Sequence, residues 1–247
     1  MRAARTSPTL AVMKILHYPR FCLTVLLLMA LAFPAVARDG ADPAINRPYL
    51  DPDFAQWVER FESPGREVYD RRAAIVAASG VKPGMRVADI GAGTGLFTLL
   101  FARAVGPTGH VTAVDISPTF AANIQRRAQN EKLGNVGTRV NSQTDTGLPP
   151  ASVDLVFISD AYHHFEQPRA MLASIHRALR AGGTLIVIEF ERDEGKSSTW
   201  VLGHVRAGKQ QVIGEIEAAG FRLTVDTGLL KENFYLRFEK VATDTRK

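Results

Sequence analysis

The feature that most constrains this chain is the run Arg86-Val-Ala-Asp-Ile-Gly-Ala-Gly-Thr-Gly95, in which a short apolar segment leads directly into alternating glycines. Val87, Ala88 and Ile90 form the nearly continuous apolar pattern of a strand that is buried on both faces of a parallel sheet. The glycines permit positive φ angles and close backbone approach, and the apolar segment from Leu96 predicts a helix whose first N–H groups face the same place. A ligand can therefore bind against bare backbone at this turn.

The spacing of the glycines separates two kinds of nucleotide site. In the dinucleotide fingerprint G-x-G-x-x-G the third glycine packs helix against strand, and this chain has Leu96 at that position. The run D-x-G-x-G-x-G from Asp89 to Gly95 instead resembles motif I of class I S-adenosylmethionine-dependent methyltransferases. In that family the loop backbone approaches the methionine part of the cofactor, and the acidic residue helps to organise that end. A glycine-rich turn without a ligand is the alternative.

The segments around this motif predict a doubly wound α/β domain. Strand patterns over residues 110–115, 137–140, 153–158 and 184–190 alternate with helical patterns over residues 96–105, 118–132 and 167–179. Residues 200–219 read as mostly helical, and residues 222–226 and 233–239 as a terminal pair of strands. Two helical patterns, one with Phe54 and Trp57 and one from Val68 to Ala77, precede the sheet. We therefore expect a Rossmann-like, seven-stranded sheet with two additional N-terminal helices.

Further segments resemble the same family at the expected carboxyl ends of strands. Asp115 lies 24 positions after Gly91 at the end of the second strand, where a carboxylate accepts hydrogen bonds from ribose hydroxyls. The alternative is an N-cap or turn aspartate, because Ser117-Pro118 starts a helix just afterwards. The L-P-x-x-S-x-D run from Leu148 and the R-x-L-x-x-G-G-x-L run from Arg177 resemble small-molecule methyltransferases of the ubiquinone/menaquinone-biosynthesis type.

The resemblance implies a set of cofactor-binding residues, with one departure. The family usually has an aspartate four residues before Leu148 to contact the adenine amino group, whereas this chain has Thr144, so Asp145 or Gln143 is the expected substitute. The N-terminal helices either cover the cofactor as a lid, with Arg66, Glu67, Tyr69 and Arg72 as candidates, or simply pack on the sheet. The residues predicted to bind S-adenosylmethionine are Asp89, Gly91, Ala92, Gly93, Gly95, Asp115, Ile116, Asp145, Ser159 and Tyr69.

The acceptor end of the site is expected after the fourth strand. Methyl transfer from a sulfonium needs positioning, and it needs a base only if the accepting atom loses a proton. The segment Ser159-Asp-Ala-Tyr-His-His-Phe165 resembles the family's histidine-pair segment, and its candidate catalytic residues are His163, His164, Asp160 and Tyr162. Alternatively, one histidine packs at the start of the next helix while the other lines the cofactor pocket.

Two observations bear on metals and on the later histidine. His204 either reaches the pocket from the helix over residues 200–219 or is exposed. No H-E-x-x-H motif, cysteine pair or dense carboxylate cluster accompanies Asp160, so no metal site is expected.

Charge and motif content argue against a nucleic-acid substrate. Four of the 30 basic residues and none of the 25 acidic residues fall within residues 1–37, which leaves 26 basic against 25 acidic residues in the remainder. That remainder has no basic excess to bind phosphates, and Ser159-Asp-Ala-Tyr162 lacks the N/D-P-P-Y segment of enzymes that methylate base amino groups. A small, partly apolar metabolite is the expected methyl acceptor, with a protein as the alternative. The oligomeric state is not indicated.

Residues 1–37 have the parts of a secretory signal peptide. Lys14 and Arg20 precede the apolar run 21–33, and Ala35-Val36-Ala37 is a small-x-small cleavage site. We predict cleavage after Ala37, an irregular lead-in over residues 38–52 and a methyltransferase domain over residues 53–247. Cys22, the only cysteine, lies inside the apolar run, so the mature chain would contain no thiol. The expected location is periplasmic or secreted.

Alternatives to that location are a membrane-anchored protein, if the leader is not cleaved, and a cytoplasmic protein. Met13 is an alternative start, because residues 13–37 alone make a well-proportioned signal. Export also raises a second functional hypothesis, since S-adenosylmethionine is charged and is made in the cytoplasm. The second hypothesis is an exported, catalytically inactive methyltransferase-like domain that binds or senses a ligand. Such a domain would not need a continuous supply of S-adenosylmethionine.

Overall fold

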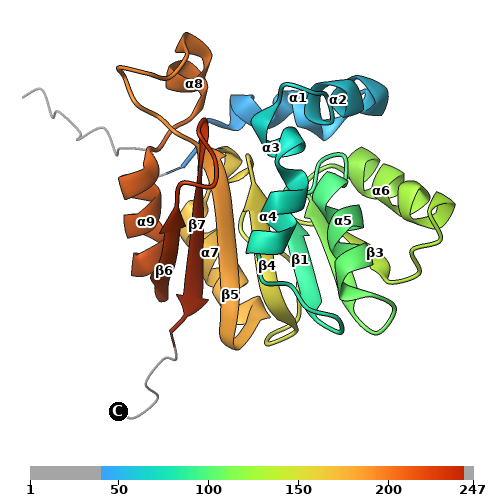
Figure 1. Cartoon of the computed structure of the whole chain (residues 1–247). Coiled ribbons are helices and arrows are strands. Elements are labelled where there is room, and N and C mark those ends of the chain that lie inside the picture. Colours follow the sequence, from blue (N-terminus) through green and yellow to red (C-terminus); the bar gives the residue numbers. More distant parts are fainter. Residues whose placement is uncertain (1–39, 242–247) are drawn as a thin grey trace, which may run out of the picture. The chain divides into compact units, whose positions relative to one another are not determined.

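The computed structural model describes residues 40–241, and within them the chain forms one seven-stranded sheet in the order β3-β2-β1-β4-β5-β7-β6 (Figure 1). Strands β1 to β5 run parallel, while β7 runs antiparallel to both β5 and β6. The strands are β1 (Arg86–Ile90), β2 (His110–Asp115), β3 (Val136–Val140), β4 (Val153–Ser159), β5 (Leu179–Phe190), β6 (Phe221–Thr227) and β7 (Asn233–Lys240). The predicted doubly wound sheet with a terminal antiparallel pair is confirmed.

Helices cover both faces of this sheet and bury alternate residues of its strands. Leu155 and Phe157 of β4 belong to the core under α4 (Arg72–Ala78), α5 (Leu96–Val105) and α6 (Pro118–Asn130). Val156 and Ile158 face the opposite core, under α7 (Pro168–Ala178) and α9 (Lys209–Ala218). Because both faces of β4 are buried, its near-continuous apolar run matches the pattern expected of a central parallel strand.

The N-terminal segment lies across the carboxyl ends of the strands (Figure 1). It comprises η1 (Pro43–Asn46), α1 (Arg47–Leu50), α2 (Phe54–Phe61) and α3 (Glu67–Asp70). The prediction of an irregular lead-in over residues 38–52 is wrong for residues 43–50. Pro43 and Pro48 occupy first-turn positions of these short helices, where the missing N–H costs nothing, and the Asp42 side chain caps the first one.

The single helix expected over residues 200–219 is two helices in the structure. α8 (Thr199–His204) ends before α9 begins, and the segment between them buries Val205 and Ala207. A short turn, η2 (Tyr162–His164), follows β4 and carries the histidine pair. No helix within residues 40–241 is long and apolar enough to cross a membrane. The predicted signal peptide over residues 1–37 lies outside the described residues.

Candidate active site

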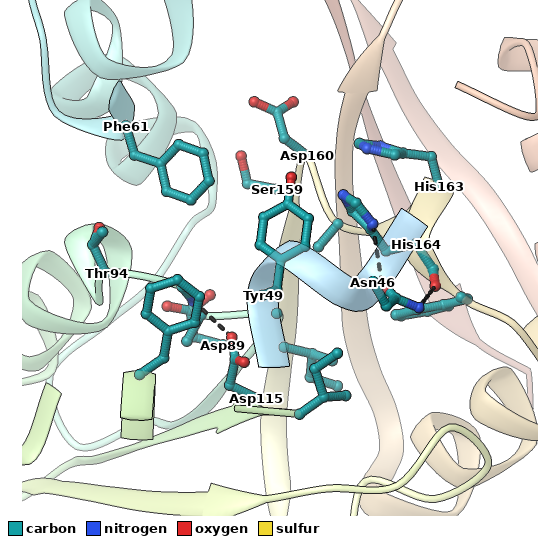
Figure 2. A pocket seen from close by; sticks show the side chains of 18 of the residues that line it. Asn46, Tyr49, Phe61, Asp89, Thr94, Asp115, Ser159, Asp160, His163 and His164 are labelled. Carbon is teal, nitrogen blue, oxygen red and sulfur yellow. Dashed lines mark hydrogen bonds between the residues drawn. The ribbon is translucent and has the colours of Figure 1, made fainter. Parts of the chain in front are cut away.

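A cavity of about 390 Å³ lies where β1, β2 and β4 end, beneath the N-terminal helices (Figure 2). Its floor is the glycine loop after β1 and the end of β2. Its walls come from the segment after β4, from α1 and α2, from Arg66 before α3, and from α8. The lining includes Asn46, Tyr49, Arg60, Phe61, Arg66, Asp89, Gly91, Ala92, Gly93, Asp115, Ile116, Phe120, Asn141, Gln143, Ser159, Asp160, His163, His164, Trp200 and His204.

Three glycines shape the loop, and each one meets a different constraint. Gly91 and Gly93 have φ angles of 70° and 53° and both line the cavity. A Cβ atom on Gly91 would lie 2.4 Å from the Cβ atom of Ala161, so this glycine lets the loop pass the segment after β4. Gly95, predicted to bind cofactor, lies outside the cavity lining, and a Cβ atom there would lie 2.8 Å from Ile124 of α6. Its role is to let α5 and α6 approach each other.

Asp115 fixes the loop after β1 to the end of β2. Its Oδ2 atom accepts a hydrogen bond from the backbone N–H of Gly93 at 2.8 Å, and its Oδ1 atom accepts one from Ser117 at 2.9 Å. The Ser117 side chain itself caps α6, so Asp115 is not the cap of this helix, whereas its hydrogen bond from the Ser117 N–H is the contact that a turn aspartate makes. Burial raises the pKa of Asp115 to about 6, against the effect of these hydrogen bonds. Both the carboxylate and the loop backbone face the cavity (Figure 2).

Asp89 is the second buried carboxylate of this floor. Its Oδ2 atom accepts a hydrogen bond from Thr98 Oγ1 at 2.6 Å, and the residue lines the cavity. Burial raises the pKa of Asp89 to about 7, while the Thr98 hydrogen bond lowers it. A cation or hydrogen-bond donor placed in the cavity would favour the ionised form of both aspartates.

Besides Gly95, three predicted site residues lie outside the cavity lining. Tyr69 has the Arg72 guanidinium over its ring at 4.1 Å, and Asp145 binds Arg177 at 2.7 Å and the N–H of Gly147. Tyr162 is fully buried, and its hydroxyl donates to Glu215 at 2.6 Å. These three predictions are therefore corrected.

Their neighbours take the positions instead. Gln143, named with Asp145 as the substitute for the family's aspartate, lines the cavity together with Asn141. His163 faces the cavity while Tyr162 faces the core. In each case two side chains of one short segment point in different directions, and one of the two lines the cavity.

Asp160 is held at the cavity wall in an unusual backbone conformation. Its φ angle is 48°, and its carboxylate accepts hydrogen bonds from Arg66 Nη2 at 2.5 Å and from Asn233 Nδ2 at 2.6 Å. Burial raises the pKa of Asp160 to about 6, while the Arg66 charge acts in the opposite direction. This ion pair joins the N-terminal cover to the end of β4, and it confirms the predicted proximity of Arg66 to the site.

The two adjacent histidines have different partners. His163 Nδ1 lies 2.7 Å from Glu189 Oε2, and His164 Nδ1 lies 3.1 Å from Asn46 Oδ1. Burial lowers the pKa of His163, but the charge and hydrogen bond of Glu189 raise it, and the net shift is upward. Burial lowers the pKa of His164 to about 2, with a further contribution from the charges of His163 and His204. His164 is therefore neutral and is a poor base.

Several cavity residues were not among the predicted site residues. Tyr49 of α1 packs against Trp57 and His164, with ring centroids 4.6 and 4.7 Å apart. Phe61 belonged to an N-terminal helical pattern for which a lid over the cofactor and packing on the sheet were both open, and Asn46 lay in the predicted irregular lead-in. Trp200 stacks on His204 with centroids 4.4 Å apart. An aromatic residue on a helix over a cofactor looks, in sequence, like any core residue.

The central part of the chain is similar in sequence to known proteins. Residues 88–187 match the model of the methyltransferase domain family. The chain is 35% identical over 118 residues to a ubiquinone/menaquinone biosynthesis C-methyltransferase of Hydrogenovibrio crunogenus. The aligned segment covers 47% of this chain and 46% of the relative. The corresponding enzyme of Vibrio campbellii is 34% identical over 119 residues, with 47% and 46% covered. The chain thus matches about half the length of these curated relatives.

Solved structures share the fold at low sequence identity. A methyltransferase from Aquifex aeolicus that depends on S-adenosylmethionine superposes with a TM-score of 0.68 at 22% identity, covering 77% of this chain and all of that one. A geranyl diphosphate C-methyltransferase from Streptomyces coelicolor gives 0.59 at 15%, covering 72% and 88%. Residues 88–187 are thus similar to the methyltransferase domain family, and the described part of the chain shares its fold with these methyltransferase structures.

Proposed function

We propose that this protein transfers the methyl group of S-adenosylmethionine to a small, partly apolar acceptor. The observation that carries the proposal is that one cavity is lined both by the glycine loop and by Tyr49, Phe61 and the histidines. Its volume of about 390 Å³ falls within the roughly 300–1,000 Å³ that is usual for small-molecule sites.

The residues of the floor fit the cofactor of this family. Asp115 can accept hydrogen bonds from ribose hydroxyls, and Asp89 lies where it can face the ammonium group of the methionine part. Gln143 and Asn141 offer amide groups to an adenine edge. The open backbone at Gly93 permits close approach, since a Cβ atom there would meet Phe61 only at 3.4 Å.

The chain's contribution to the reaction is positioning. The cofactor supplies an activated methyl group and a good leaving group when it is bound. The N-terminal helices exclude water from the cavity and hold the acceptor against the floor, which lowers the entropic cost of bringing two reactants into line. The relatives are named C-methyltransferases of ubiquinone/menaquinone biosynthesis. For this chain, assays with labelled cofactor would identify the atom that accepts the methyl group.

Cofactor binding provides the first test. Calorimetry with S-adenosylhomocysteine should give a micromolar dissociation constant, about −8 kcal/mol. Gly93→Val should abolish binding by blocking backbone approach. Gly182→Val is the matched control, because Gly182 also has a positive φ angle, of 68°, but lies away from the cavity with open space around it. Equal binding by the two variants would contradict the proposed site.

Turnover separates the enzyme from the inactive binding domain. Methyl transfer from labelled S-adenosylmethionine to small molecules of a cell extract should depend on protein and be lost in Gly93→Val. Micromolar cofactor binding without transfer to any fraction would favour the sensing alternative. The Asp160, Arg66 and histidine side chains that line the same cavity favour the enzyme, because a domain that only binds cofactor needs no polar side chains beyond those that contact the cofactor.

A further inference from the structure

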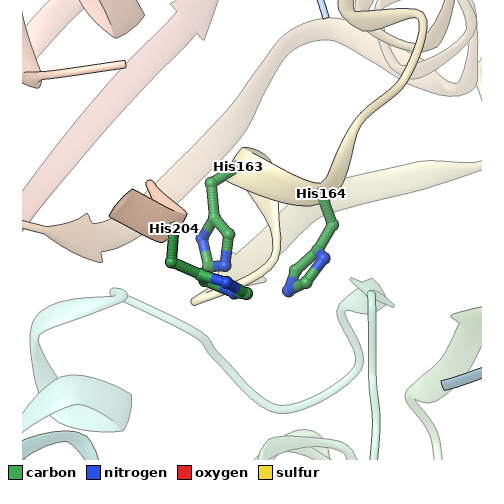
Figure 3. Close-up of side chains that lie close together, drawn as sticks. All are labelled: His163, His164 and His204. Atoms are coloured by element: carbon green, nitrogen blue, oxygen red, sulfur yellow. The ribbon is translucent and has the colours of Figure 1, made fainter. Parts of the chain in front are cut away.

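Three histidines from two distant segments meet at the acceptor end of the cavity. His163 and His164 follow β4, and His204 is the last residue of α8 (Figure 3). Each offers one ring nitrogen within 4.8 Å of the other two. All three residues line the cavity. We call these residues the three-histidine cluster.

Two of the rings are oriented by acceptors that fix where the proton sits. A carboxylate oxygen only accepts, so His163 donates from Nδ1 to Glu189 Oε2, and the lone pair of its neutral ring is at Nε2. The Asn46 amide is oriented by its own donors, because Nδ2 donates to the His164 carbonyl at 3.1 Å and to Glu166 Oε1 at 2.8 Å. Asn46 Oδ1 therefore accepts from His164 Nδ1. Both rings thus present Nε2 as an acceptor.

His204 supplies the third nitrogen on a constrained helix end. Its Nε2 atom is buried and lacks a hydrogen-bond partner among the described residues. Trp200 stacks on the ring, and Arg192 donates to the carbonyls of Val205 and Leu202, which holds the end of α8 against the loop after β5. A buried nitrogen without a partner carries a cost that a bound ion would remove.

We propose that the three-histidine cluster binds a divalent first-row transition metal ion, with Zn²⁺ as the reference ion. Three imidazole nitrogens with an open fourth position are the ligand set of catalytic zinc sites. A carboxylate or amide that accepts from the remote ring nitrogen is the usual outer partner of a metal-bound histidine, and Glu189 and Asn46 have that arrangement. The Glu189 carboxylate also offsets part of the ion's charge.

The geometry needs only a small adjustment to close around an ion. Nitrogen ligands of a tetrahedral zinc ion lie about 3.4 Å apart, from a Zn–N distance of about 2.1 Å. The ligand atoms here lie within 4.8 Å of one another, so rotation of the rings suffices. The open position faces the cavity, where water or an oxygen or sulfur atom of an acceptor completes the coordination. This role rests on the proposed methyl transfer, whereas ion binding itself does not.

Metal binding is tested on tag-free, chelator-stripped full-length protein without cofactor. Calorimetric titration with Zn²⁺ alone should show one site per chain, and Co²⁺ should give the visible spectrum of a nitrogen-ligated, four-coordinate ion. His204→Asn should weaken Zn²⁺ binding at least about 100-fold. Glu189→Gln, which changes only the outer partner, should weaken it about 10- to 100-fold. His110→Asn and His176→Asn are the matched controls, since neither residue lines the cavity.

The outcomes distinguish a metal site from histidines that act as bases or only line the cavity. Absence of stoichiometric Zn²⁺ binding, or equal binding by wild type, His204→Asn and the two controls, would overturn the proposal. Circular dichroism of each variant separates loss of ligand from loss of fold. Titration of the metal-free wild type with S-adenosylhomocysteine is a separate measurement, so that failure of the proposed function and failure of the metal site remain distinguishable.

Discussion

At the scale of single residues, the floor of the cavity contains two carboxylates, Asp89 and Asp115, and burial disfavours the ionised form of both. Burial raises the pKa of Asp115 to about 6 and that of Asp89 to about 7. A raised folded-state pKa means that the free protein binds more protons than the unfolded chain between about pH 4 and pH 7. Its stability therefore falls as pH rises through this window. A ligand that donates hydrogen bonds to the ionised forms gains affinity in the same window.

The raised pKa values of Asp115 and Asp89 predict a pH-dependent cofactor affinity. S-adenosylhomocysteine should bind at least about tenfold more weakly at pH 5 than at pH 7, because Asp115 is about nine-tenths protonated at pH 5. Asp115→Asn should remove the transition near pH 6 and leave the one near pH 7 that belongs to Asp89. The measurement is calorimetry across this pH range, and a flat profile for the wild type would show that neither carboxylate contacts the ligand.

The sequence could predict the residues that lie within one local turn, but it could not choose among neighbours. Asp89, Gly91 and Gly93 follow from a strand-to-helix turn whose geometry is set by adjacent residues. Gln143 faces the cavity and Asp145 faces Arg177, a choice that depends on the path of the loop after β3. His204 lies 41 positions after His163, and only the packing of α8 brings the two rings together.

At the scale of elements, the N-terminal helices are part of the site rather than an addition to the fold. Their prolines predicted irregular chain because proline excludes most helix positions, yet first-turn positions tolerate it. The helical pattern that contains Phe54 and Trp57 is confirmed as a helix over Phe54–Phe61, since its apolar residues recur at helical spacing. What the sequence could not show is which surface this apolar side covers. That surface includes the cavity between the ends of β1, β2 and β4.

The junction of α3 with the loop before β7 provides a test of this arrangement. The Glu67 carboxylate accepts hydrogen bonds from the backbone N–H groups of Lys231, Glu232 and Asn233 at 2.7, 2.7 and 3.2 Å. Glu67→Gln should reduce the free energy of unfolding by about 1–2 kcal/mol, because charge-assisted acceptors are lost. Urea denaturation measures this change. The exposed Glu59→Gln is the control, and equal effects of the two substitutions would contradict a specific tether.

At the scale of the whole molecule, the leader and the domain make different demands. We propose that residues 1–37 direct export and are removed. The proposal is supported by the charged start, the apolar run 21–33 and the Ala35-Val36-Ala37 site. In a cytosolic protein, thirteen mostly apolar residues would add an aggregation-prone segment unless they were buried. The domain meanwhile needs a cofactor that is made inside the cell.

Export predicts a mature protein that begins near Arg38. Cell fractionation followed by N-terminal sequencing should find this species in the periplasmic or secreted fraction, and Ala37→Leu should cause the precursor to accumulate. A full-length protein in the membrane, with its domain protected inside the cell, would instead make the leader an anchor. Such an anchor would also remove the difficulty of cofactor supply.

The cover over the cavity is joined to the body of the protein on several sides. Asn46 binds the segment after β4, Glu62 pairs with Arg127 of α6, Arg66 pairs with Asp160, and Glu67 binds the chain before β7. A cover that is attached along one edge can open by a hinge motion. This cover must instead release several hydrogen bonds and ion pairs before a ligand of cofactor size can leave. If the protein turns over as proposed, we expect release of the spent cofactor, rather than methyl transfer itself, to limit the rate.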